Sequence, residues 1–288
     1  MKKRILSSIL VLAILCGAYR LGADGVATLI TLIGLSTQME FYTLLKKMEQ
    51  KPFVLMGMAC GILLMLGVYL SHKFQFLCAH SPLFSTFVPN SDECLALLIT
   101  LVILRALLPR SPEMVRRIIP TTMGLIVPFM CTFPLKFIAI SGRDNFGIRV
   151  VFYVIFTAKA CDIGGIFAGK YFGRRKLVAR ISPNKTIEGA IGGILCSNVV
   201  GMAIALLHGS FLVAKLTFPG TIVSVVAAST LLAIFSMLGD FLESAIKRLA
   251  KEKDSGNILP GMGGIFDLTD SLLFALPLGT IFALHFLH

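Results

Sequence analysis

Residues 244–270, SAIKRLAKEKDSGNILPGMGGIFDLTD, place basic side chains, acidic side chains and a glycine pair between two strongly apolar segments. Ionisable groups beside a bilayer are costly and usually functional, so this stretch stands out in a chain that is 56% apolar. Its carboxylates suit a divalent metal ion, and its cations and glycine backbone suit phosphate groups. The stretch therefore predicts phosphate chemistry between two membrane helices.

The flanking segments belong to a series of apolar stretches that runs through all 288 residues. Only 15% of the residues are charged, whereas a soluble protein carries about a quarter. Segments long and apolar enough to cross a bilayer lie at 5–20, 25–45, 53–71, 94–108, 121–140, 150–168, 189–207, 221–239 and 268–287. The sequence thus predicts an all-α, polytopic integral membrane protein with about nine transmembrane helices. Residues 1–18 also have the pattern of a signal peptide, and we expect them to stay as an uncleaved first span.

The net charge of +12 is unevenly distributed along this series. If the N-terminus lies inside, the predicted inner loops hold 19 of the 27 Lys and Arg residues, in agreement with the positive-inside rule. We therefore expect the N-terminus on the cytoplasmic side of the cytoplasmic (inner) membrane. Topology and anionic membrane lipid explain the basic residues, so nucleic acid is not expected as a partner.

The distribution of polar residues divides the chain near residue 145. Residues 1–145 are predicted to form N-terminal transmembrane helices with short basic loops. Residues 146–288 are predicted to form a C-terminal transmembrane catalytic region, because their polar residues gather on the predicted cytoplasmic face. In the first region, Glu40 either pairs with a neighbouring lysine at the interface or points toward a site, and the sequence leaves both open.

The seven cysteines show no spacing typical of metal ligands. Most lie in predicted spans, where cysteine behaves as a small apolar residue. Cys78 and Cys94 flank a predicted outer loop, and the sequence leaves their pairing open.

One candidate constellation lies within the predicted span 150–168. Lys159 and Asp162 are three residues apart, so they share a helix face and can neutralise each other. They form either an ion pair that fixes helix packing or the polar wall of a site. We favour the site, because charges within a membrane are usually functional.

A second constellation precedes the predicted span 189–207. Pro183 ends any preceding helix, and Ser182 or Thr186 can cap the next one, with Glu188 near its first turn. A helix N-terminus with Lys185 beside it is a natural site for an anion. We therefore expect Lys185 to bind phosphate.

The third constellation is the opening stretch with the residues before it. Residues 241–252 have an apolar stripe on one face and Lys247, Arg248 and Lys251 on the other, as in a helix that lies in the membrane interface. Their cations face lipid headgroups or a bound phosphate. Lys253, Asp254 and the glycine-rich segment 260–264 follow.

Three carboxylates flank this stretch. Asp240 ends the predicted span 221–239, and Asp267 and Asp270 lie three residues apart at the start of the next span. If the two spans pack as antiparallel neighbours, the carboxylates gather, and gathered carboxylates repel unless a cation binds them. A magnesium site is the simplest explanation, and helix capping by Asp267 and Asp270 is the structural alternative.

These segments resemble the phosphatidate cytidylyltransferase family, also called CDP-diacylglycerol synthases. The family signature S-x-x-K-R, K-D and P-G-H-G-G-x-x-D-R-x-D is matched here by Ser244, Lys247, Arg248, Lys253, Asp254, Pro260, Gly261, Gly263, Gly264, Asp267 and Asp270. The upstream motif S-P-x-K-T-x-E-G is matched by Ser182, Pro183, Lys185, Thr186, Glu188 and Gly189, and the aspartate ahead of a G-x-x-x-G element by Asp162. The resemblance covers about residues 160–275, and long, charge-rich motifs at fixed spacing are specific.

The resemblance implies transfer of the cytidylyl group of CTP to phosphatidate, which gives CDP-diacylglycerol and pyrophosphate for phospholipid synthesis. It implies catalytic roles for Asp240, Asp267 and Lys185, and a site for Mg²⁺, with or without a second cation, at Asp240, Asp267 and Asp270. The implied substrate-binding residues are Ser182, Thr186, Glu188, Lys247, Arg248, Lys253, Asp254, Gly263, Gly264 and Asp162. The expected partners are CTP, phosphatidate and membrane lipid, and the resemblance also implies a homodimer.

Two positions depart from the family pattern. Met262 stands where the family has histidine, and Leu268 stands where it has arginine. Neither side chain can donate a proton or pair with phosphate. Because the aspartates and Lys185 are retained, we expect an active variant.

Three alternatives stay open. The first is a CTP-dependent kinase or cytidylyltransferase that acts on another lipid, such as a polyprenol. The second is a polytopic transporter, and the third is an inactive scaffold. A kinase needs a base to activate a hydroxyl group. A transporter is disfavoured, because the charges cluster at one face and no paired broken helices recur in the two halves.

Overall fold

The computed structural model describes residues 2–77, 100, 112–140, 145–178, 182–207, 218–258 and 263–286. The chain forms two compact units. The first comprises Met1–Ile148 and Leu249–Leu268, and the second comprises Arg149–Arg248 and Thr269–His288. Residues 249–268 are thus grouped with the N-terminal helices, and the division near residue 145 stays a prediction.

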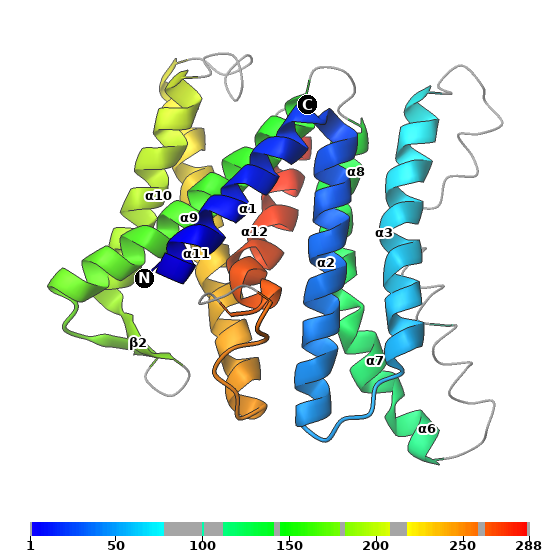
Figure 1. The fold of residues 1–288 in the computed structure, drawn as a ribbon. Coiled ribbons are helices and arrows are strands. Elements are labelled where there is room, and N and C mark those ends of the chain that lie inside the picture. The colour runs from blue at the N-terminus through cyan, green and yellow to red at the C-terminus, as the bar shows by residue number, and fades with distance from the viewer. Residues whose placement is uncertain are drawn as a thin grey trace. The chain divides into compact units, whose positions relative to one another are not determined.

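The first unit is built around three long helices. Its described helices are α1 (Lys2–Arg20), α2 (Gly22–Lys47), α3 (Val54–Leu77), α6 (Pro112–Arg116), α7 (Ile118–Gly124) and α8 (Ile126–Ile140). Helices α2, α3 and α8 pack against one another, as the blue-to-green part of Figure 1 shows. Cys60, Leu64 and Val68 lie four residues apart on one face of α3 and pack with Leu125 in the core.

Hydrogen bonds fix α2 against its neighbours. The fully buried Tyr42 donates its hydroxyl to the carbonyl oxygen of Thr121 (2.8 Å), and Gln38 Nε2 donates to the carbonyl oxygen of Gly57 (2.9 Å). A Cβ atom at Gly57 or Gly124 would overlap the Tyr42 side chain, so both neighbouring segments approach α2 closely. Satisfied polar groups of this kind specify one arrangement of a buried helix.

The second unit contains the remaining helices and a short β-ribbon. These elements are α9 (Phe146–Phe172), β1 (Lys176–Val178), β2 (Ser182–Thr186), α10 (Ile187–Leu207), α11 (Phe218–Leu249) and α12 (Ile265–Phe286). The first residues of α9 and α12 and the last residue of α11 are assigned to the first unit. The strands are antiparallel, with Lys176 opposite Thr186 and Val178 opposite Ser182. The sequence analysis did not predict this ribbon.

Glycines bring α9 and α10 together. A Cβ atom at Gly193 would lie 2.8 Å from the carbonyl oxygen of Cys161, and one at Gly189 would lie 2.9 Å from that of Gly165. Small residues of this kind let two membrane helices pack backbone to backbone. The close contact places Gly165 and Gly189 in the wall of the cavity described below.

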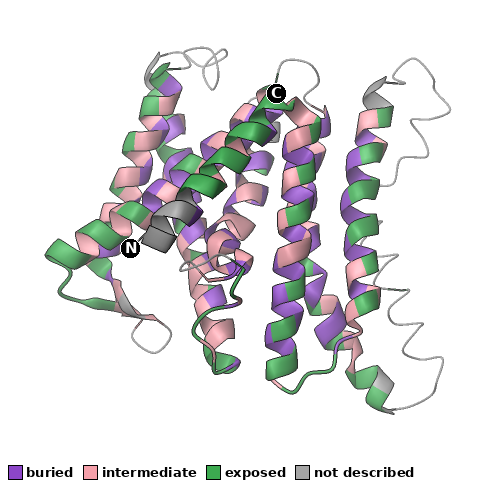
Figure 2. Ribbon diagram, in the orientation of Figure 1, coloured by how far each residue is buried: buried purple, intermediate pink, exposed green. Residues whose placement is uncertain are grey.

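Six helical segments among the described residues are long and apolar enough to cross a membrane. They are Val54–Phe74, Ile118–Ile140, Phe146–Phe172, Ile187–Leu207, Ile222–Leu249 and Ile265–Ala283. Large apolar side chains on them are exposed, such as Phe167 (61%), Leu195 (61%) and Leu207 (81%). Figure 2 colours the exposed residues of the ribbon green. The prediction of an all-α polytopic membrane protein is therefore confirmed, with a two-stranded ribbon added.

The other three predicted spans are not among these six segments. The spans 5–20 and 25–45 fall in α1 and α2, and the described apolar part of α1, Ile9–Arg20, is too short by the same measure. The predicted span 94–108 lies outside the described residues, except for residue 100. Cys78 and Cys94 also lie outside the described residues.

Candidate active site

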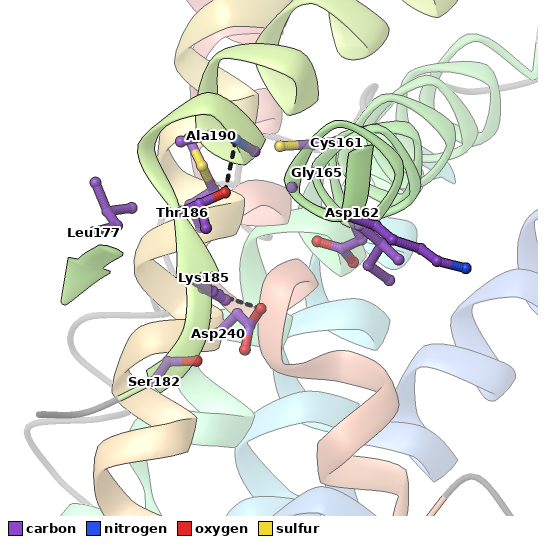
Figure 3. Close-up of a pocket in the computed structure, with 14 residues that line it drawn as sticks. Cys161, Asp162, Gly165, Leu177, Ser182, Lys185, Thr186, Ala190 and Asp240 are labelled. Atoms are coloured by element: carbon purple, nitrogen blue, oxygen red, sulfur yellow. Dashed lines mark hydrogen bonds and ion pairs between the residues drawn. The ribbon is translucent and has the colours of Figure 1, made fainter. Parts of the chain in front are cut away.

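The second unit encloses a cavity of about 400 Å³ between α9, β2, α10 and α11. Asp162, Ser182, Lys185, Thr186 and Asp240 contribute to its wall. Figure 3 shows Asp162 on α9 facing Lys185 and Asp240 across the cavity. A volume of this size is typical of sites for small molecules, so the cavity is large enough for a nucleotide.

Lys185 and Asp240 form an ion pair in the wall of this cavity. Lys185 comes from β2, and Asp240 comes from α11, 55 residues later in the chain. The ammonium group of Lys185 also lies 4.2 Å from the centroid of the Phe241 ring, which favours a cation at that position. Both side chains of the ion pair are about one-quarter exposed, so they remain accessible to a ligand.

The turn between β2 and α10 is held by Thr186 and Glu188. Thr186 Oγ1 accepts a hydrogen bond from the backbone N–H of Gly189 (3.1 Å), so the predicted cap of this helix is confirmed with Thr186. The Glu188 carboxylate accepts bonds from the backbone N–H groups of Arg174 (3.0 Å) and Arg175 (3.2 Å). These bonds fix the N-terminus of α10, where backbone dipoles favour a bound anion.

Three carboxylates lie together in the second unit. One oxygen atom from each of Asp240, Glu243 and Asp270 lies within 4.8 Å of the others. Gly239 allows this grouping, because a Cβ atom there would overlap the carbonyl oxygen of Asp270 and separate α11 from α12. The donor set consists of hard carboxylate oxygens, which Mg²⁺ prefers.

Glu243 is the residue that the sequence analysis missed. It lies three residues after Asp240 on α11, so an Asp-x-x-Glu spacing on one helix face was a usable signal. Its side chain is 2% exposed, and its Oε1 atom forms an ion pair with Lys247 (2.7 Å). This pair gives Lys247, predicted to bind substrate, a carboxylate partner within the same helix.

Another ion pair lies within α9 and is bridged by a serine of α12. Lys159 Nζ is 3.1 Å from Asp162 Oδ2, so the predicted neutralisation of these two side chains is confirmed. Ser271 links them, since it accepts a bond from Lys159 (2.8 Å) and donates one to Asp162 (3.1 Å). Among the residues that the structure describes, Asp270 is the member of the acidic group without an ammonium within ion-pair distance.

Asp267 has its described contacts in the first unit. Its Oδ2 atom accepts bonds from the backbone N–H of Gly264 (2.7 Å) and from the backbone N–H (2.9 Å) and hydroxyl (3.0 Å) of Ser255. Gly263 has φ of +95°, a value that suits glycine, and a Cβ atom there would overlap the Asp267 carboxylate. In the structure Asp267 thus caps the start of α12, and its role as a metal ligand stays a prediction.

The other predicted residues lie near the end of α11. Arg248, Lys253 and Asp254 are exposed, where a substrate can reach them, and their binding roles stay predictions. Leu268 is partly buried on α12, and Met262 lies outside the described residues. Glu40 contacts the segment 255–266, whereas the nearby Lys47 pairs with Glu252 (2.8 Å).

Comparison with known proteins places these features in context. Residues 2–286 match the sequence model of a family described as the cytidylyltransferase family. The chain is 44% identical over 141 residues to the phosphatidate cytidylyltransferase of Bacillus subtilis (strain 168), in a match that covers 49% of each chain. It is 40% identical over 132 residues to the protein of the same name from Staphylococcus aureus (strain COL), covering 46% of this chain and 48% of that one. The chain thus spans about half the length of the curated relatives it matches.

Proposed function

Because this chain belongs to the cytidylyltransferase family, we propose that it transfers the cytidylyl group of CTP to phosphatidate, giving CDP-diacylglycerol and pyrophosphate. The observation that carries the proposal is the ion pair of Lys185 and Asp240 in a cavity of about 400 Å³. Asp240 also belongs to the group of three carboxylates, so a phosphate-binding cation and a metal-binding set share one residue. The curated relatives named phosphatidate cytidylyltransferase support the choice of substrates.

In the proposed reaction, an oxygen atom of phosphatidate bonds to the α-phosphorus of CTP. The bond from that phosphorus to the bridging oxygen of the β-phosphate breaks, and pyrophosphate leaves. Phosphate is already a nucleophile at neutral pH, so no strong base is needed. Catalysis then depends on positioning and on neutralisation of charge.

The residues of the second unit divide this work. Lys185 neutralises a phosphate oxygen, and Asp240 and Phe241 hold its ammonium group in place. Thr186 fixes the N-terminus of α10, whose backbone N–H groups favour an anion in the cavity. Asp162 supplies a polar side chain to the cavity wall on α9, and Lys159 pairs with it. The exposed cations after α11 are suited to phosphatidate, whose phosphate lies at the membrane surface.

We propose that Asp240, Glu243 and Asp270 hold Mg²⁺, with Asp267 as a further ligand predicted from the sequence. When bound, Mg²⁺ supplies positive charge that stabilises phosphate oxygens in the transition state. The three grouped carboxylates offer hard oxygen donors, which support this assignment. A second cation at the same site remains compatible with it.

We further propose nine spans, an N-terminus on the cytoplasmic side, and an active site that faces the cytoplasm from the inner membrane. The six apolar segments account for two-thirds of this topology, and α1, α2 and the segment 94–108 would supply the rest. The uneven distribution of Lys and Arg supports the orientation. A homodimer remains a prediction.

The choice of lipid acceptor tests the proposal. We expect purified protein in detergent, with CTP and Mg²⁺, to convert phosphatidate but neither diacylglycerol nor a polyprenol. Only phosphatidate carries an ionised phosphate, which can attack without a base to activate it. Mass spectrometry of the lipid extract identifies the product. A phosphorylated polyprenol would support the kinase instead, and no product from folded protein would support the inactive scaffold.

A further inference from the structure

Glu40 belongs to α2, and its carboxylate contacts the start of α12. The residue is 7% exposed. Its oxygens accept hydrogen bonds from the backbone N–H groups of Ile265 (3.0 Å) and Phe266 (2.8 Å) and from the hydroxyl of Ser255 (2.8 Å). Ile265 and Phe266 are the first two residues of α12, whose N–H groups have no partner within the helix. Glu40 therefore caps α12 from a helix more than 200 residues earlier in the chain.

Two glycines before α12 leave the space that this carboxylate occupies. A Cβ atom at Gly256 would lie 2.7 Å from Glu40 Oε1, and one at Gly264 would overlap Glu40 Oε2. Two glycines of the charged stretch are thus required by the close approach of the loop to Glu40. Ser255, Gly256 and Gly264 therefore pack closely around the carboxylate within the first unit.

Ser255 joins Glu40 to Asp267. Its hydroxyl lies 2.8 Å from Glu40 Oε2 and 3.0 Å from Asp267 Oδ2, and its backbone N–H also bonds to Asp267. The position of Asp267 therefore depends on a loop that Glu40 holds. Gln38 and Tyr42 fix α2 on either side of Glu40, so the carboxylate itself is presented from a rigid support.

We propose that Glu40 is a positioning residue of the active site, which holds Ser255, Gly256 and the first turn of α12 in place and thereby sets the affinity for Mg²⁺ and CTP. This inference rests on the proposed function, because α12 carries Asp267 and Asp270. Glu40 acts through these residues and touches no reacting atom. The N-terminal helices then contribute to catalysis, which is one of the two possibilities that the sequence leaves open for Glu40.

The substitution Glu40→Gln tests the inference. Glutamine keeps the size of the side chain, but its amide group presents donors to the N–H and O–H donors around it. We expect faster hydrogen–deuterium exchange in peptides that cover 254–266. We also expect about a 10-fold rise in the Mg²⁺ concentration for half-maximal rate, with kcat at saturating Mg²⁺ within about 3-fold of the unmodified protein.

The matched control is Glu113→Gln, which removes an exposed carboxylate paired with Lys51 in the same unit and should change neither readout. If Glu40→Gln fails to fold, Ser255→Ala removes the shared hydroxyl with less disruption and should move both readouts in the same direction. Unchanged exchange, or an unchanged Mg²⁺ requirement in a folded and active variant, would overturn the inference.

The exchange measurement also separates this inference from the proposed function. If the unmodified protein has no CTP-dependent activity, the proposed function fails. Exchange in 254–266 still reports whether Glu40 orders the loop, and the same exchange with and without Mg²⁺ reports whether the loop responds to the ion. No response of the loop to either Glu40→Gln or Mg²⁺ would contradict the positioning role.

Discussion

Replacement of Asp240 by asparagine is expected to lower kcat for CDP-diacylglycerol formation by at least about 100-fold. Asparagine keeps the shape of the side chain but removes the charge that pairs with Lys185 and one of the three grouped carboxylates. Both the proposed phosphate-binding cation and the proposed metal site are then disturbed. Initial rates with labelled CTP in detergent measure the effect, and size-exclusion chromatography checks the fold.

The matched control for this variant is Asp24→Asn. Asp24 forms an ion pair with Lys73 in the first unit, and its side chain is 67% exposed. An exposed pair of this kind contributes little to stability, so the rate should stay within about 2-fold of the unmodified protein. A rate for Asp240→Asn that is as high as that of Asp24→Asn would contradict the site described here.

Asp267→Asn is the second substitution with a large expected effect. The side-chain oxygen of asparagine can still accept bonds from Gly264 and Ser255, so we expect the loop and the start of α12 to keep their structure. The charge is lost, and we expect the rate to fall by about 100-fold if the carboxylate contributes to metal binding. Rates over a range of Mg²⁺ concentrations measure the change.

This variant distinguishes two roles of one carboxylate. If Asp267 only caps α12, asparagine preserves the cap and the rate stays close to that of the unmodified protein. That result would remove Asp267 from the proposed metal site and leave the group of Asp240, Glu243 and Asp270. The thermal melting temperature serves as the control, because loss of the cap itself would lower it.

The membrane helices could be predicted because their signal is local. Apolar runs of about 20 residues identify a span without knowledge of its neighbours. The pair of Lys159 and Asp162 and the cap at Thr186 were predictable for the same reason, since each depends on residues three apart. A motif with fixed spacing indicated Lys185 as a site residue, and the position of Asp240 at the end of a predicted span indicated Asp240, although nothing local predicted their ion pair.

Features that depend on tertiary packing could not be predicted in this way. Strands of three and five residues give too little periodicity to identify the ribbon that carries Lys185. Glu40 meets its partners only through the packing of α2, and a single acidic residue in an apolar segment does not reveal whether it faces a lysine or a distant loop. The grouping of Glu243 with Asp240 and Asp270 depends on the close approach of α11 and α12 at Gly239.

The central claim is that this chain transfers a cytidylyl group, and the fate of each CTP phosphate tests it most directly. Purified protein is incubated with phosphatidate, Mg²⁺ and CTP that carries ³²P at either the α or the γ position, and the lipid and aqueous phases are counted separately. We predict that the α label enters the lipid phase and that the γ label appears in aqueous pyrophosphate. Transfer of the γ label to lipid, with the α label left in a soluble nucleotide, would contradict the account.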